Sequence, residues 1–266
     1  MQSFLEKIIR KFKLVYINIF KPKIINNYNY KGVRVNLDLK KHVDYRLYIN
    51  TFESTTINYF IDCLKKDMVV LDVGANIGIY SLISSKIVGG NGAVFAFEPS
   101  PYCQKRISEN MNLNSFKNIT IIESCVSNTN GTTDFYLCDD DAYNSMTKYT
   151  MLPYEKKIEL PVITIDDFIK NKKLNSVDIL KIDTEGVDHL VIEGASETIR
   201  LFHPIIFFEY NRVISDKSSS NIGSGLYLLW DLGYEIYEFR NEILTLIEFD
   251  TLPTQSDIIA IFKIKS

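Results

Sequence analysis

The segment Val69-Val70-Leu71-Asp72-Val73-Gly74-Ala75-Asn76-Ile77-Gly78 decides the fold of this 266-residue chain. Residues 68–73 form a short apolar run rich in Val, which is typical of a strand buried on both faces of a parallel sheet. Gly74 and Gly78 frame the turn that follows, and because they lack a Cβ they let the backbone bend sharply and approach a ligand. The turn leads into a helix expected over residues 77–88. This strand, turn and helix predict a βαβ unit that holds a nucleoside.

A second strand, expected over residues 93–97, brings Glu98 to its carboxyl end. A carboxylate there can accept two hydrogen bonds from a ribose diol, and Pro99 ends the strand because it cannot continue the hydrogen-bonding ladder. The turn before it lacks the G-x-G-x-x-G spacing of dinucleotide sites and the Lys and Ser or Thr of phosphate loops, so no pyrophosphate grip is expected. Asp72 would repel a pyrophosphate but suits a ligand that carries an ammonium and a sulfonium. The predicted cofactor is therefore S-adenosylmethionine, held by Asp72, Gly74, Ala75, Asn76, Gly78, Glu98 and Pro99.

Three further residues are candidates for the same cofactor site. Glu53 lies at the start of a helix expected over residues 51–65, which leads into the motif strand; a helix-start carboxylate favoured by the macrodipole is an equally good explanation. Ser124 and Cys125 follow a third strand, expected over residues 119–123, and could border the adenine edge. Packing of small residues under that strand is the alternative.

Five motifs lie in order over roughly residues 50–215: Asp72-Val-Gly-Ala-Asn-Ile-Gly78, Phe97-Glu98-Pro99, Glu109-Asn110-Met-Asn-Leu-Asn114, Lys181-Ile-Asp183-Thr-Glu185-Gly186 and Pro204-Ile-Ile-Phe-Phe-Glu209. Together they resemble the FkbM family of S-adenosylmethionine-dependent methyltransferases. The resemblance implies an α/β, Rossmann-like class I methyltransferase fold, in which helices cover both faces of a seven-stranded, mostly parallel sheet with one antiparallel strand. It also implies O-methylation of a hydroxyl on a saccharide or glycosylated metabolite.

Two other functions stay open at this point. An NAD-dependent oxidoreductase would use a similar strand, turn and helix, but the glycine spacing disfavours it. A non-catalytic module on the same fold would bind the cofactor without turnover, and the set of acidic residues argues against it.

The candidate catalytic residues follow a strand expected over residues 177–182. Methyl transfer to a hydroxyl requires a general base, or a metal that lowers the pKa of the hydroxyl. Asp183 is the first candidate for base or metal ligand, and Glu185 for the orienting group or second ligand. His189 is an alternative base if one helical turn places it on a common face with Glu185, although a lone His there more often packs or lies at the surface. Lys181 is expected to pair with one of the nearby carboxylates.

An insertion is predicted between strands over residues 132–138 and 158–163. Loops at the carboxyl ends of a parallel sheet commonly determine acceptor specificity, so we expect this role here. Asp139, Asp140 and Asp141 could bind a divalent cation or a cationic substrate, with a solvated turn as the favoured alternative. Three tyrosines of the insertion could stack on sugar faces, namely Tyr143, Tyr149 and Tyr154. Glu209, at the end of a strand over residues 205–208, could complete an acidic rim or pair with Arg212.

Composition limits the partners. The net charge of −3 and the pI near 5.7 give no overall attraction for nucleic acid. The four cysteines lack metal-binding spacing and no signal peptide is recognised, so a cytoplasmic location is expected. Residues 1–23 predict a basic amphipathic helix that packs on the domain or a partner, with peripheral contact to an anionic membrane as the alternative. We expect a helix and β-ribbon appendage over residues 1–50 and a methyltransferase domain over residues 51–266.

Overall fold

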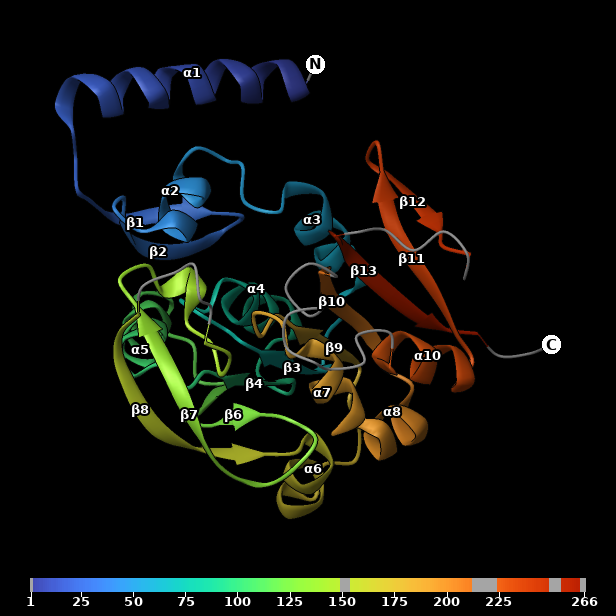
Figure 1. The fold of residues 1–266 in the computed structure, drawn as a ribbon. Helices are drawn as coiled ribbons and strands as arrows, with labels where there is room; N and C mark the ends of the chain where they lie inside the picture. Colours follow the sequence, from blue (N-terminus) through green and yellow to red (C-terminus); the bar gives the residue numbers. More distant parts are fainter. Residues whose placement is uncertain (1, 149–153, 212–223, 249–254, 264–266) are drawn as a thin grey trace.

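The computed structural model describes residues 2–148, 154–211, 224–248 and 255–263. Its centre is an eight-stranded sheet with the strand order β12-β11-β13-β10-β9-β3-β4-β5 (Figure 1). The strands are β3 (Val69–Val73), β4 (Ala93–Phe97), β5 (Ile119–Ile122), β9 (Ile179–Ile182), β10 (Ile205–Asn211), β11 (Tyr234–Arg240), β12 (Ile243–Leu246) and β13 (Gln255–Phe262). Neighbouring strands from β10 to β5 run parallel, whereas β13 is antiparallel to both β10 and β11. The predicted mostly parallel sheet is confirmed.

The sheet has eight strands because β12 pairs with the free edge of β11, so the expected count of seven strands with one antiparallel was wrong. Asn241 and Glu242 connect the two strands and have positive φ values of 50° and 65°. Positive φ at both central residues is the mark of a type I′ turn, which suits a two-residue hairpin. Glu at the second position is an unusual choice for that turn, so the sequence pattern did not indicate it.

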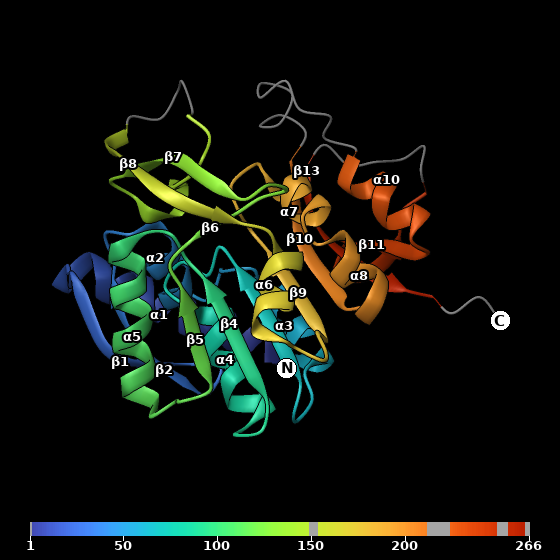
Figure 2. The ribbon, with the colours of Figure 1, turned by 90° about the horizontal axis from the view of Figure 1, so that it is seen from below.

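Helices cover both faces of the sheet, as predicted (Figure 2). One face packs against α3 (Ser54–Cys63), α4 (Ile79–Val88) and α5 (Pro101–Asn114), and the core there includes Phe60, Leu82 and Ile107. The other face packs against α6 (Ile165–Lys172), α7 (Asp188–Glu193), α8 (Ser196–Phe202) and α10 (Ser224–Asp231). Because apolar side chains bury the central strands on both sides, the ends of the strands are left to form the site.

The N-terminal region consists of α1 (Gln2–Phe20), the antiparallel pair β1 (Ile24–Tyr30) and β2 (Val33–Asp38), and α2 (His42–Tyr48). The helix and the ribbon were predicted, whereas α2 was not. A buried ion pair of 2.6 Å between Arg106 Nη2 and Asp44 Oδ1 ties α2 to α5. The ribbon shares the core formed by α3 and α4, and the division at residue 50 stays a prediction. No helix in the described part of the chain is long and apolar enough to cross a membrane.

The predicted insertion is a three-stranded sheet with the order β6-β8-β7. It contains β6 (Cys125–Val126), β7 (Gly131–Cys138) and β8 (Tyr154–Ile163), and the 3-10 helix η1 (Asp141–Tyr143) follows β7. The expected antiparallel partners β7 and β8 are confirmed, and the two-residue strand β6 was missed. Figure 2 shows this small sheet beyond the carboxyl ends of β4 and β5.

Candidate active site

A cavity of about 540 Å³ opens at the carboxyl ends of β3, β4, β9 and β10. The order of strands along the chain reverses between β3 and β9, and α/β sheets bind ligands at such a switch point. The predicted site residues that line the cavity are Glu53, Gly74, Ala75, Asn76, Glu98, Pro99, Ser124, Cys125, Asp183 and Glu185. Asp72, Gly78 and His189 are not among its lining residues. The folded chain therefore brings most of the predicted cofactor-binding residues and two of the predicted catalytic residues into one cavity.

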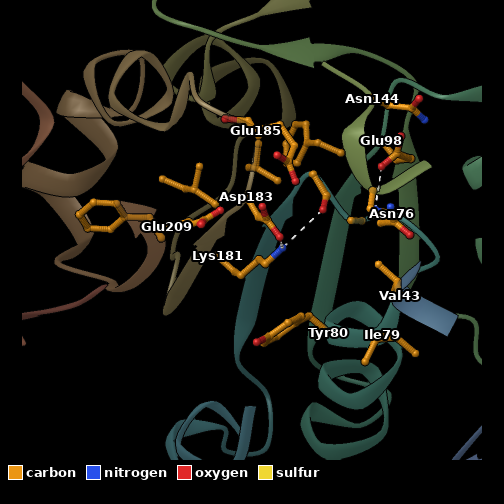
Figure 3. Close-up of a pocket in the computed structure, with 18 of the residues that line it drawn as sticks. Val43, Asn76, Ile79, Tyr80, Glu98, Asn144, Lys181, Asp183, Glu185 and Glu209 are labelled. Atoms are coloured by element: carbon orange, nitrogen blue, oxygen red, sulfur yellow. Dashed lines mark hydrogen bonds and ion pairs between the residues drawn. The ribbon is translucent and has the colours of Figure 1, made fainter. Parts of the chain in front are cut away.

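Glu98 lies on one side of the cavity, fixed by backbone amides (Figure 3). Its Oε2 accepts a hydrogen bond of 2.7 Å from the amide of Asn76, and its Oε1 accepts one of 2.8 Å from the amide of Ser100. Burial raises the pKa of Glu98 to about 8, although both amides oppose that rise. Because a carboxylate oxygen can accept more than one hydrogen bond, Glu98 can also accept bonds from ligand hydroxyls.

The two glycines of the motif serve different purposes. Gly74 has a φ of +77°, and a Cβ there would lie 1.8 Å from the carbonyl oxygen of Asp183. This close approach brings the turn after β3 against the end of β9. Gly78 also has a positive φ, but a Cβ there would meet Ile107 at 3.1 Å. The expected cofactor contact of Gly78 is therefore replaced by a role in starting α4 and packing it on α5.

Asp72 points away from the cavity, so the expected direct contact of its side chain with the cofactor was wrong. It is fully buried, and its Oδ2 accepts a hydrogen bond of 2.5 Å from Ser81 Oγ in α4. Its Oδ1 lies 3.8 Å from Lys181 Nζ. Burial raises the pKa of Asp72, and the charge of Lys181 opposes the rise.

Lys181 forms the expected ion pair with Asp183, at 3.2 Å between Nζ and Oδ2. Its Nζ also lies 3.4 Å from the carbonyl oxygen of Gly74 and 5.0 Å from the centre of the Tyr80 ring. Burial alone would lower the pKa of Lys181, but the charges of Asp183, Asp72 and Glu53 outweigh it, so that pKa is raised. One buried cation thus connects β3, β9 and the cavity.

Five further carboxylates line the cavity: Glu53, Asp183, Glu185, Glu209 and Asp257. Figure 3 shows Asp183, Glu185 and Glu209 on the side opposite Glu98. Burial and the charge of Asp183 raise the pKa of Glu53 to about 7, and Tyr80 Oη donates a 2.6 Å hydrogen bond to its Oε2. Burial, followed by the negative charges of Asp183, Glu209 and Asp188, raises the pKa of Glu185 well above its ordinary value. Glu209 accepts a hydrogen bond of 2.7 Å from Gln255 Nε2; Arg212, its expected alternative partner, lies outside the described residues.

His189 is buried within α7 and does not line the cavity. The expected common face with Glu185 is wrong because α7 begins at Asp188 and Glu185 has a left-handed backbone with a φ of +54°. Burial lowers the pKa of His189. Its position against Gly225 in α10 indicates packing between the two helices.

The insertion closes the cavity together with α2. Asp140 Oδ2 accepts a hydrogen bond of 3.1 Å from the amide of His42, and Asp141 Oδ2 lies 3.7 Å from Lys41 Nζ. Burial raises the pKa of Asp141 to about 6. Asp140 and Asp141 therefore join the insertion to the start of α2, and the favoured solvated turn holds only for the exposed Asp139. Tyr143 lines the cavity and stacks on His42, Tyr154 does not line it, and Tyr149 lies outside the described residues.

Asp183 and Glu185 were predicted as possible metal ligands. Over residues 2–148, 154–211, 224–248 and 255–263, no group of three or more His, Cys, Asp or Glu side chains could hold a metal ion. The side chain of Asp183 faces Lys181 instead. The metal role of Asp183 and Glu185 stays a prediction.

Comparison with known proteins shows that the sequence matches a protein family. The methyltransferase FkbM domain matches residues 72–236. The chain belongs to the FkbM methyltransferase family. The membership predicted from the five motifs, and with it the Rossmann-like methyltransferase fold, is confirmed.

Two curated relatives are similar to this FkbM chain over about half of its length. The 2-O-methyltransferase NoeI of Sinorhizobium fredii is 26% identical over 161 residues, which cover 55% of this chain and 65% of that protein. The hexuronic acid methyltransferase AglP of Haloferax volcanii is 25% identical over 154 residues, which cover 58% of this chain and 61% of that protein. The matches thus span less than two thirds of either relative. A crystal structure of the methyltransferase FkbM from Methylobacillus flagellatus has a TM-score of 0.49 and 14% identity, covering 82% of this chain and 54% of that one.

The FkbM match begins at Asp72, so α2 and Glu53 lie before it. Sequence reasoning missed three residues of α2 that line the cavity, namely His42, Val43 and Arg46. The helix has only seven residues and no side-chain hydrogen bond at its N-cap. Neither a capping pattern nor a long apolar period was present to indicate it.

Proposed function

We propose that this chain is an S-adenosylmethionine-dependent O-methyltransferase that acts on a hydroxyl of a saccharide or glycosylated metabolite. The observation that carries the proposal is a single cavity at the switch point, with Glu98 on one side and clustered carboxylates on the other. FkbM membership supports methyl transfer. The names of the relatives, a 2-O-methyltransferase and a hexuronic acid methyltransferase, support an oxygen acceptor on a sugar.

The residues that line the cavity fit the proposed cofactor. Glu98 would accept hydrogen bonds from the ribose hydroxyls, beside the backbone of Ala75 and Asn76. Ser124 and Cys125 line the same cavity and would border the adenine edge in this proposal. The acidic wall suits a ligand that carries an ammonium and a sulfonium. When bound, S-adenosylmethionine supplies a methyl group activated by its positively charged sulfur.

We assign the general base to the pair of Asp183 and Glu185, and the electrostatics favour Glu185. The ion pair with Lys181 holds the Asp183 carboxylate in position, so Asp183 is suited to orient the acceptor. The raised pKa of Glu185 makes its carboxylate a stronger base than an ordinary glutamate. In this scheme Glu185 takes the proton of the acceptor hydroxyl, and Asp183 orients that hydroxyl. This reverses the order in which the sequence ranked the two residues.

The decisive experiment measures binding and turnover separately. S-adenosylhomocysteine binding is followed by calorimetry, and methylation is followed by S-adenosylhomocysteine production with a library of saccharide acceptors. At about pH 9, where Glu98 with its pKa of about 8 is charged, Glu98→Gln should weaken binding by about ten- to a hundredfold, because hydrogen bonds to a charged group are lost. Glu185→Gln should leave binding nearly intact and lower kcat by about 10²–10⁴-fold.

Glu123→Gln is the matched control, since Glu123 follows β5, is exposed and does not line the cavity. It should change neither quantity. Cofactor binding without turnover on any acceptor would favour a binding module over an enzyme. Absence of binding at millimolar concentration would overturn the cofactor assignment.

We also propose a cytoplasmic location. All four cysteines are free thiols, which supports it: Cys63, Cys103, Cys125 and Cys138.

A further inference from the structure

The outer face of α1 exposes large apolar side chains. Phe12 is 71% exposed, Ile19 66% and Phe20 68%. Val15, at 53%, and Tyr16, at 40%, lie between them on the helix. At about 3.6 residues per turn, these side chains fall within an arc of about 140° on one side of the helix. A contiguous exposed apolar surface of this kind marks an interaction site.

The opposite face of α1 already has partners in the fold. Leu14 and Ile17 are partly buried and pack against the core shared with the β1–β2 ribbon. Lys13 Nζ lies 2.7 Å from Tyr28 Oη and 3.3 Å from Asn50 Oδ1. In Figure 1, α1 runs above α2 and the ribbon, apart from the central sheet. The outer apolar face is therefore not needed to hold the helix on the protein.

The charge of this segment is opposite to that of the rest of the chain. Residues 1–23 contain six Lys or Arg and one Glu, a net charge of +5, whereas the whole chain carries −3. The remaining residues therefore carry −8. Arg10, Lys11, Lys21 and Lys23 are exposed and form no ion pair within the described part of the chain. A partner that matches the outer face of α1 must offer both an apolar region and negative charge.

We propose that α1 docks the protein onto an anionic membrane surface, lying in the plane of the interface. Phe12 and Ile19 would enter the boundary between headgroups and acyl chains, as in interfacial amphipathic helices. Lys11 and Lys13 fall on the two flanks of the apolar arc at helical spacing, and the exposed Lys11 can extend its ammonium group to the anionic headgroups.

A second copy of the chain fits this surface less well. The usual symmetric dimer buries the same patch on both subunits, which would bring two segments of charge +5 together. An anionic bilayer provides the apolar layer and the opposite charge at the same place. The charge pattern therefore favours the membrane.

Vesicle co-sedimentation of the full chain tests the proposal without any methylation assay. The wild type should bind vesicles with about 30 mol% phosphatidylserine at least about tenfold more strongly than phosphatidylcholine vesicles, and salt should weaken the binding. The double variant Phe12→Ser/Ile19→Ser should lose about tenfold or more, because two apolar side chains no longer insert. Arg10→Gln/Lys11→Gln should lose about fivefold per residue on the anionic vesicles alone.

Leu201→Ser is the matched control, because Leu201 is 70% exposed on α8, far from α1 in the sequence, and should leave vesicle binding unchanged. Unchanged S-adenosylhomocysteine binding and thermal unfolding show that the α1 variants are folded. Equal binding to neutral and anionic vesicles, or equal binding by wild type and Phe12→Ser/Ile19→Ser, would overturn the proposal. So would concentration-dependent dimerisation that this double variant abolishes, if no vesicle binding accompanies it, since the occupant would then be a second copy.

Discussion

Replacement of Lys181 by Met should lower the free energy of unfolding by about 3–5 kcal/mol at neutral pH, as expected when one partner of a buried ion pair is removed. Lys181 is 6% exposed and lies 3.8 Å from the carboxylate of Asp72, which is 0% exposed. Met keeps the volume of the lysine stem but leaves the buried Asp72 carboxylate without a cation. Asp183 contributes less to the loss, because its side chain is 33% exposed and water can solvate its charge.

The double variant Lys181→Met/Asp72→Asn separates this effect from simple loss of packing. The amide introduced by Asp72→Asn carries no charge that needs a cation, so the double variant should be more stable than Lys181→Met alone, with a coupling of about 1–3 kcal/mol. The pH dependence has a definite sign. Without Lys181 the folded-state pKa of Asp72 rises further above the unfolded value, so the folded state binds more protons. The loss should therefore be small near the unfolded pKa and grow as the pH rises through the folded pKa.

Urea unfolding at neutral pH and at about pH 5 measures both effects, the lower pH lying closer to the ordinary pKa of Asp. Lys157→Met is the matched control. Its ion pair with Asp134 is shorter, 2.9 Å against 3.8 Å for Lys181 and Asp72, but the two side chains are 50% and 47% exposed. That change should cost less than about 1 kcal/mol. Equal costs for the two lysine variants, or strictly additive effects of Lys181→Met and Asp72→Asn, would refute the argument.

Three further predictions concern the cavity. Gly74→Ala should abolish S-adenosylhomocysteine binding in calorimetry and lower the unfolding temperature, because its Cβ would lie 1.8 Å from the carbonyl oxygen of Asp183; retained binding would contradict the geometry. The association constant of S-adenosylhomocysteine should rise with pH and level off above about pH 8, since the charged form of Glu98, whose pKa is about 8, accepts ribose hydrogen bonds better. Glu98→Gln should remove this pH dependence. If the pH dependence persists in that variant, it belongs to another group. Asp141→Asn should weaken the contact between the insertion and Lys41 and raise the acceptor KM by about two- to tenfold, while the affinity for S-adenosylhomocysteine, measured in the same assay, stays within about twofold.

The sequence predicted the parts of the fold whose signals are local. The motif strand, its glycine turn and the strand before Glu98 were found because burial on both faces leaves continuous apolar runs. The helix α2 was missed because it is short and held by a distant ion pair between Asp44 and Arg106. The strand β12 was missed because its pairing depends on a two-residue turn without glycine.

In the site, too, the sequence predicted what depends on local signals and missed what depends on packing. Glu98 and Asp183 could be placed at the cavity because strand ends meet at one edge of a parallel sheet. The orientation of Asp72 could not, because a side chain next to a strand end can face either the ligand or a covering helix, and here Ser81 of α4 draws it inward. The place of His189 depended on where α7 begins, and helix boundaries are weakly encoded in sequence.

The shared lysine explains why two motifs far apart in the sequence belong together. Asp72 and Lys181 are paired residues on the neighbouring parallel strands β3 and β9, so their side chains project from the same face of the sheet. The carboxylate buried under α4 can remain charged because Lys181 lies beside it, and the same cation positions Asp183 in the cavity. Loss of Lys181 would leave the Asp72 carboxylate uncompensated in the core and would remove the ion-pair partner of Asp183 in the site. The electrostatics of the proposed catalytic wall and the stability of the central sheet thus depend on one ion-pair network.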